Sequence, residues 1–223
     1  MPELQLYDQL LQFPLFQGMS RADLLLMAGN TRFGFQKVAH GKAVVKEDQA
    51  CQQLTFLVRG TLKATTQAAD HAYTFVETFN APFLIQPEAL FGLTQRYTRT
   101  MQADTECHLI NISKDEVLRM LDDFLVFRLN LLGLLATQSQ RLARHPWRRV
   151  PQTLEERITR FFTDHCLYPA GQKEVHILMT RLADELNASR LDISKALNQM
   201  QARSLLTLHR GRIVIPMLER LIM

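Results

Sequence analysis

Residues 179–198 read MTRLADELNASRLDISKALN, and the spacing of their small, turn-forming and apolar residues indicates two short helices that cross steeply. Ala183 leaves room for the second helix to approach the first, and Asn187 tolerates the left-handed backbone that a tight turn needs. The apolar residues expected to fill the wedge between the helices are Leu182, Leu186, Ile193 and Leu197. The stretch predicts a helix-turn-helix, a motif that places its second helix in the major groove of DNA.

A β-hairpin with a basic tip is predicted directly after this motif. Residues 205–208 and 213–215 are apolar runs on either side of His-Arg-Gly-Arg at 209–212, which is the pattern of a winged-helix wing. Upstream, residues 150–178 supply a capped helix and then a short strand at 175–178. The C-terminal part is therefore predicted to be a winged helix-turn-helix domain.

Charge is distributed unevenly along the 223 residues. Residues 1–140 hold 12 Lys/Arg and 14 Asp/Glu, whereas residues 141–223 hold 14 and 8, a net charge of +6. A basic segment that carries a helix-turn-helix is the electrostatic pattern expected for contact with phosphates.

The N-terminal half is rich in alternating and β-branched runs. After two short helices near residues 4–13 and 20–28, strands are predicted within residues 31–39, 42–47, 54–65, 72–79 and 101–112. Many short strands with turn residues between them favour an antiparallel jelly roll. The fold class is therefore predicted to be α+β.

A long helix is predicted from about residue 124 to residue 144, and the residue before Pro146 should end it. Its first half is apolar nearly all round, so more than one side must be covered. One track keeps a 4-3 spacing that suits close approach of a second copy: Leu125, Leu129, Leu132, Ala136, Ser139 and Ala143. The alternative is a core helix within one subunit.

Strands, a long helix and then NASRLDISKALNQMQARSLLTLHRGRIVI resemble the family of the cyclic-AMP receptor protein and the fumarate-and-nitrate-reduction regulator, the Crp/Fnr family. The resemblance implies a cytoplasmic, homodimeric transcription regulator with double-stranded DNA, RNA polymerase and a small-molecule effector as partners. It implies a cyclic-nucleotide-binding-like sensor domain at 1–121, a dimerisation helix and hinge at 122–149, and a winged-helix domain at 150–223.

The second helix of the motif, residues 189–199, provides the predicted base contacts. Ser189 can cap the helix and reach a phosphate, and Arg190 can donate two hydrogen bonds to a guanine. Lys195 and Asn198 follow on the same side of the helix. Leu191 stands where the family commonly has a glutamate, so only an apolar contact, such as one with a thymine methyl, is expected there. Phosphate contacts are predicted for Thr180, Arg181, Arg210 and Arg212.

The effector pocket departs from the family pattern, which pairs Gly-Glu with Arg-Ser or Arg-Thr. In the matching stretch, Pro87 replaces the glycine and supplies no N–H, although Glu88 is available as a ribose ligand. The candidates for anion or base contact are Arg96, Arg99, Thr100, Thr137 and Ser139. The departure favours a ligand other than cyclic AMP, or a domain that senses no ligand by this route, and no cofactor can be named.

Other classes have weaker signals. Three scattered cysteines cannot hold an iron–sulfur cluster within one chain, and His71 or His108 alone is weak evidence for haem. A cupin-type metal enzyme would need a His-x-His pair that the chain lacks, so no catalytic or metal site is predicted. A scaffold that uses the winged helix for protein contacts remains an alternative, and Leu191 supports it. Neither a signal peptide nor a membrane span is predicted.

Overall fold

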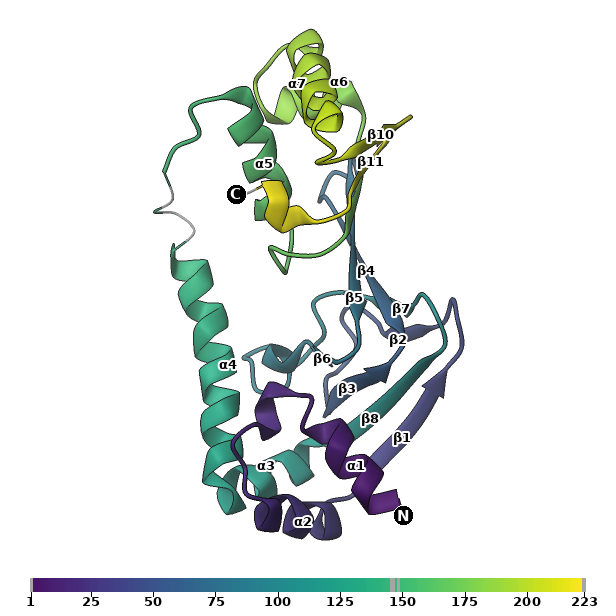
Figure 1. Ribbon diagram of the computed structural model, residues 1–223, viewed down its shortest axis with the longest axis vertical. Coiled ribbons are helices and arrows are strands. Elements are labelled where there is room, and N and C mark those ends of the chain that lie inside the picture. Colours follow the sequence, from purple (N-terminus) through teal and green to yellow (C-terminus); the bar gives the residue numbers. More distant parts are fainter. Residues whose placement is uncertain (1, 145–146, 148, 222–223) are drawn as a thin grey trace. The chain divides into compact units, whose positions relative to one another are not determined.

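The computed structural model describes residues 2–144, 147 and 149–221, which fall into two units (Figure 1). Unit 1 comprises Met1–Leu62 and Asn80–Arg148, and unit 2 comprises Lys63–Phe79 and Arg149–Met223. The predicted end of the long helix at His145-Pro146 lies outside the described residues.

Unit 1 is a mixed α/β unit with an antiparallel, jelly-roll-like arrangement of strands. One sheet has the order β1-β8-β3-β6, and β2 pairs separately with β7. The strands are β1 (Phe33–Val38), β2 (Ala43–Val45), β3 (Gln53–Arg59), β6 (Phe83–Ile85), β7 (Met101–Ala103) and β8 (Cys107–Ser113). Strand β6 was not predicted, because three residues carry too little periodicity to be recognised.

Helices cover this sheet through aromatic side chains. Phe56 of β3 packs edge-on against Phe13 at 5.0 Å between ring centroids and lies 5.6 Å from Phe16, which contacts Phe127 at 5.5 Å. The helices of the unit are α1 (Pro2–Leu10), η1 (Pro14–Phe16), α2 (Arg21–Asn30), η2 (Pro87–Ala89), α3 (Lys114–Asp123) and α4 (Leu125–Arg144). All four rings are buried, so they form the core between sheet and helices.

The predicted turn at Arg59-Gly60 is present between β3 and β4. Gly60 has a φ of +103°, and a Cβ atom there would lie 2.5 Å from the carbonyl oxygen of Glu106. Only glycine fits this close approach without displacing the backbone.

Unit 2 contains a sheet in the order β10-β11-β9-β5-β4. Its elements are β4 (Thr61–Gln67), β5 (Thr74–Asn80), α5 (Leu154–Asp164), β9 (Lys173–His176), α6 (Met179–Glu185), α7 (Arg190–Ala202), β10 (Thr207–His209), β11 (Arg212–Ile215) and η4 (Leu218–Leu221). Strand β9 begins and ends two residues before the predicted strand at 175–178, because Leu178 is already the N-cap of α6. The hairpin of β4 and β5, which sequence assigns to the N-terminal region, packs with the C-terminal residues.

Candidate nucleic-acid interface

Helices α6 and α7 are joined by a sharp turn. Asn187 has a φ of +46°, the left-handed conformation predicted for it. Ser189 is the N-cap of α7: its Oγ accepts from the Asp192 backbone N–H at 3.1 Å, and its hydroxyl donates to the Asp192 carboxylate at 2.7 Å. Asp192 therefore helps to start the helix, and its carboxylate is held by a hydrogen bond at the cap.

The two faces of α7 differ completely. Ile193, Leu197 and Met200 are fully buried and belong to a cluster that includes Leu182 of α6, as the wedge prediction requires. Arg190 and Lys195 are exposed on the other face. Among the described residues, neither cation has an acidic partner within salt-bridge distance, so both charges are available to an external anion.

The remaining predicted base contacts lie on the same helix. Leu191 is 63% exposed, so its side chain is accessible to a partner. Asn198 is exposed, and its amide nitrogen donates to the Ser194 carbonyl at 2.8 Å. Its side chain is thus oriented by its own helix.

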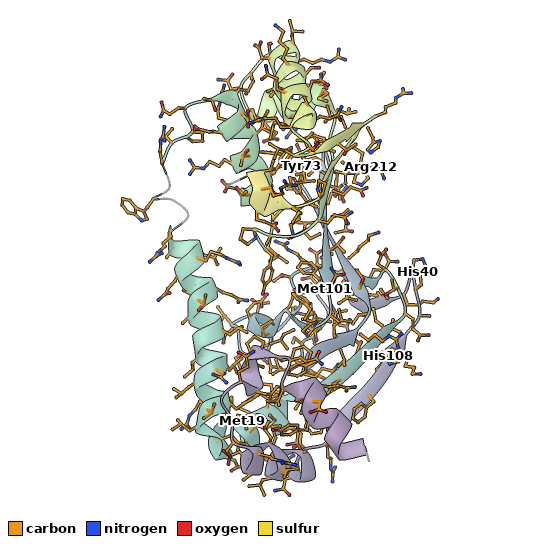
Figure 2. All side chains as sticks on the ribbon, in the orientation of Figure 1. Met19, His40, Tyr73, Met101, His108 and Arg212 are labelled. Atoms are coloured by element: carbon orange, nitrogen blue, oxygen red, sulfur yellow. The ribbon has the colours of Figure 1, made fainter. Side chains whose placement is uncertain are left out.

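The predicted phosphate contacts divide into open and occupied groups. Thr180 and Arg210 are exposed. Arg212, labelled on β11 in Figure 2, lies 3.5 Å from the Glu174 carboxylate. Arg181 lies between two carboxylates, those of Asp70 at 2.7 Å and Glu185 at 2.5 Å.

The predicted effector stretch of unit 1 is organised by a residue that the sequence analysis did not single out. Gln86 is 4% exposed, with a left-handed φ of +38°. Its Oε1 accepts from the backbone N–H and the hydroxyl of Thr98 at 2.8 and 2.9 Å, and its Nε2 donates to the Arg99 carbonyl at 2.9 Å. The N–H and the hydroxyl of Thr98 therefore both donate to Gln86.

Only some of the predicted effector residues are brought together. Burial raises the pKa of Glu88, and the nearby charges of Arg99 and Arg141 partly oppose this shift. Arg96 instead donates to the Asp48 carbonyl, and the Thr100 hydroxyl accepts from the Glu47 N–H at 3.0 Å.

The two candidates on α4 are both exposed. The Thr137 hydroxyl donates to the Gly133 carbonyl at 2.7 Å, and Ser139 lies on the predicted apolar track. A cavity of about 530 Å³ is lined by Thr137, Gln140, Arg141, Arg144 and Trp147. Sequence reasoning missed Arg141, because an arginine in the last turn of a helix is usually explained by the helix dipole.

Two of the described histidines each lie beside an oxygen atom of a neighbouring residue. His40 lies 2.7 Å from the Asp104 carbonyl, and His108 lies 3.1 Å from Glu106 (Figure 2). The described residues contain no cluster of three or more His, Cys, Asp or Glu that could hold a metal ion. In the same part of the chain, no helix is long and apolar enough to cross a membrane.

Known proteins support this description of the fold. Residues 35–124 match the cyclic nucleotide-binding domain family. The catabolite activator protein of Thermus thermophilus has 15% identity and a TM-score of 0.52, over 91% of this chain and 93% of its own. The chain shares the fold of this protein.

Two further structures share this fold. A putative Crp/Fnr-family transcriptional regulator from Eubacterium rectale has 19% identity and a TM-score of 0.50, over 94% of this chain and 96% of its own. The sensor domain of the regulator DNR from Pseudomonas aeruginosa has 21% identity and a TM-score of 0.53, over 68% of this chain and 98% of its own. Among curated proteins, none matches the sequence significantly.

Proposed function

We propose that this chain is a cytoplasmic, DNA-binding transcription regulator of the Crp/Fnr type and not an enzyme. In this proposal α6, α7 and the β10–β11 hairpin are a winged helix-turn-helix, and the functional division is 1–121, 122–149 and 150–223. One observation carries it: α7 has one fully buried face and one face with two exposed cations, and no carboxylate within the described part of the chain lies within salt-bridge distance of either cation. A helix with these two faces suits insertion into a DNA groove.

Base reading is assigned to the exposed face of α7. Arg190, at its N-terminal end, would donate to O6 and N7 of a guanine, and Lys195 would contact a base or a phosphate. Leu191 would contact a thymine methyl, and Asn198 lies further along the same helix. The phosphates would be held by Ser189, Thr180, Arg210 and Arg212, and by Arg181 once it leaves one of its two carboxylates.

A homodimer is proposed through α4. Leu125, Leu129 and Leu132 are 56%, 56% and 57% exposed, and Ala136, Ser139 and Ala143 continue the exposed track. A Cβ atom added at Gly133 would meet nothing within 4 Å, so this side of the helix is open to a partner helix. Burying the track against its two-fold copy would pair α7 with a second α7, and the operator would then be roughly palindromic.

The N-terminal domain is proposed to respond to a ligand other than cyclic AMP. Pro87 lacks an N–H, and Gln86 already satisfies the N–H and hydroxyl of Thr98. The charges of Arg99 and Arg141 act on the Glu88 carboxylate, and these three residues would surround a modified pocket. RNA polymerase is the further partner that the Crp/Fnr type implies.

A scaffold that uses α7 for protein contacts is the second candidate. The exposed Leu191, with Leu178 exposed nearby along the chain, favours it, since apolar side chains at a surface often mark protein interfaces.

Salt dependence of binding separates the two candidates. A fluorescently labelled random duplex is titrated at 50 to 300 mM NaCl, because each neutralised phosphate adds about 0.9 to the slope of log K against log [salt]. A regulator should give a slope of several units, which falls by about one in Lys195→Ala. Binding that is undetectable at low salt would refute the regulator and leave the scaffold.

A further inference from the structure

The β4–β5 hairpin is joined to the C-terminal residues of unit 2 by strand pairing. Strand β5 pairs with β9 in an antiparallel register in which Thr74 faces His176 and Glu77 faces Lys173. The side chains of Glu77 and Lys173 are each 1% exposed, and Nζ lies 3.1 Å from Oε2. Because a buried charge is costly without its counter-charge, this ion pair fixes the register between β5 and β9.

Aromatic contacts hold the same hairpin against α5. The ring of Phe75 stacks on His165 at 5.0 Å and 11°, and Tyr73 contacts Phe161 edge-on at 5.5 Å. His165 Nδ1 lies 2.7 Å from the Phe161 carbonyl, so that nitrogen is the donor. Nε2 is then free to accept the hydrogen of the Tyr73 hydroxyl, 3.0 Å away.

At its tip the hairpin reaches α6. The Asp70 carboxylate lies 2.7 Å from Nη2 of Arg181, and the Glu185 carboxylate lies 2.5 Å from the same nitrogen. Glu185 is four residues from Arg181 on one helix, whereas Asp70 comes from a different part of the sequence. The two carboxylates and the one guanidinium together carry a net negative charge.

We propose that Asp70 is a positioning residue of the DNA interface, which holds Arg181 in place and withholds it from phosphate. This inference rests on the proposed function. A DNA phosphate can bind Arg181 only by displacing a carboxylate or by approaching against its charge. Asp70 is the exchangeable partner, since Glu185 moves with Arg181 on the same helix.

The test is the affinity of Asp70→Asn for a random duplex at several salt concentrations. With Arg181 released, the affinity at 50 mM NaCl should rise about threefold to tenfold, and the slope against log [salt] should steepen by about 0.9. Asp70→Asn combined with Arg181→Ala should lose this gain. Asp184→Asn is the matched control, because it removes the same charge from an exposed position on α6.

Three results would overturn the inference while the proposed function stands. These are an unchanged affinity in Asp70→Asn, an equal gain in Asp184→Asn, or a gain that survives Arg181→Ala. If the wild type does not bind DNA, both the proposed function and the withholding role fail. The salt bridge between Asp70 and Arg181 is then tested by thermal unfolding of Asp70→Asn, Arg181→Ala and the double variant. If Asp70 holds Arg181, the effects of the two single substitutions on stability should be non-additive.

Discussion

Replacing Lys173 by methionine tests whether β5 belongs to the same folding unit as β9. The substitution keeps the length and apolar stem of the side chain but removes the ammonium that lies 3.1 Å from the buried Glu77 carboxylate. Removing one partner of a buried ion pair typically costs about 3–5 kcal/mol. The Glu77 carboxylate also accepts hydrogen bonds from the backbone N–H groups of Leu167 at 2.8 Å and Tyr168 at 3.3 Å. Because these bonds still stabilise the carboxylate in the variant, the expected loss in the free energy of unfolding is near the lower limit, about 3 kcal/mol.

The ammonium of Lys173 interacts with Glu77 by charge attraction and not through a hydrogen bond of good geometry. Although Nζ lies 3.1 Å from Oε2, it has no hydrogen-bond partner of good geometry among the described residues, and the ring of Phe79 lies 5.6 Å away. The double variant Lys173→Met, Glu77→Gln should therefore recover part of the loss and remain about 1–2 kcal/mol below the wild type. Because the pair is buried, the loss should be the same at 50 and 500 mM NaCl.

Equilibrium urea unfolding measures these differences, and hydrogen exchange locates them. Far-UV circular dichroism gives the free energy of unfolding, and amides of 63–79 and 173–176 should lose protection together in Lys173→Met. The exposed Lys195→Met serves as the control and should change stability by less than about 0.5 kcal/mol. The conclusion that β5 and β9 belong to one folding unit would be refuted if Lys173→Met lost less than about 1 kcal/mol in the free energy of unfolding. It would also be refuted if the double variant were no more stable than Lys173→Met.

Four further predictions concern binding, assembly and pH. Arg190→Ala should weaken specific DNA binding by about 1–3 kcal/mol and relax one base preference, measured by competition with single-base operator variants; an equal loss on every sequence would make Arg190 a phosphate contact. Leu132→Glu should weaken the dimer about tenfold or more in sedimentation equilibrium, because dimer formation would bury two carboxylates, whereas Leu142→Glu, off the track on the same helix, should not. Cyclic AMP at millimolar concentration should leave the melting temperature unchanged, and a dose-dependent rise would contradict the reading of Pro87 and Gln86. Burial raises the pKa of Glu88, so the folded state holds the proton of this carboxyl more readily than the unfolded chain does. Relative to Glu88→Gln, the wild type should therefore lose stability as the pH rises above 4.5, which urea unfolding at a series of pH values measures.

Local signals determined much of the C-terminal architecture. The left-handed turn at Asn187, the cap at Ser189 and the buried positions of Leu182, Ile193 and Leu197 all follow from residues within one short stretch. The capping box of Thr153 and Glu156 is present for the same reason. Turn chemistry, capping and helical periodicity act over a few residues, so they can be read along the chain.

Contacts between distant residues could be decided only by the tertiary structure. Sequence placed Arg181 among the phosphate contacts, but its salt bridge to Asp70 joins residues more than a hundred positions apart. The hydrogen bond from Thr98 to Gln86, the effect of the Arg141 charge on the pKa of Glu88 and the pairing of β5 with β9 also join residues far apart in the sequence. Sequence thus determined most of the helices and strands and which face of α7 is apolar, but not the three-residue strand β6 or the exact bounds of β9. Tertiary structure alone decided which charges are paired and which strands are neighbours, because Coulomb energy and strand pairing depend on distance in space and leave no periodic trace in the chain.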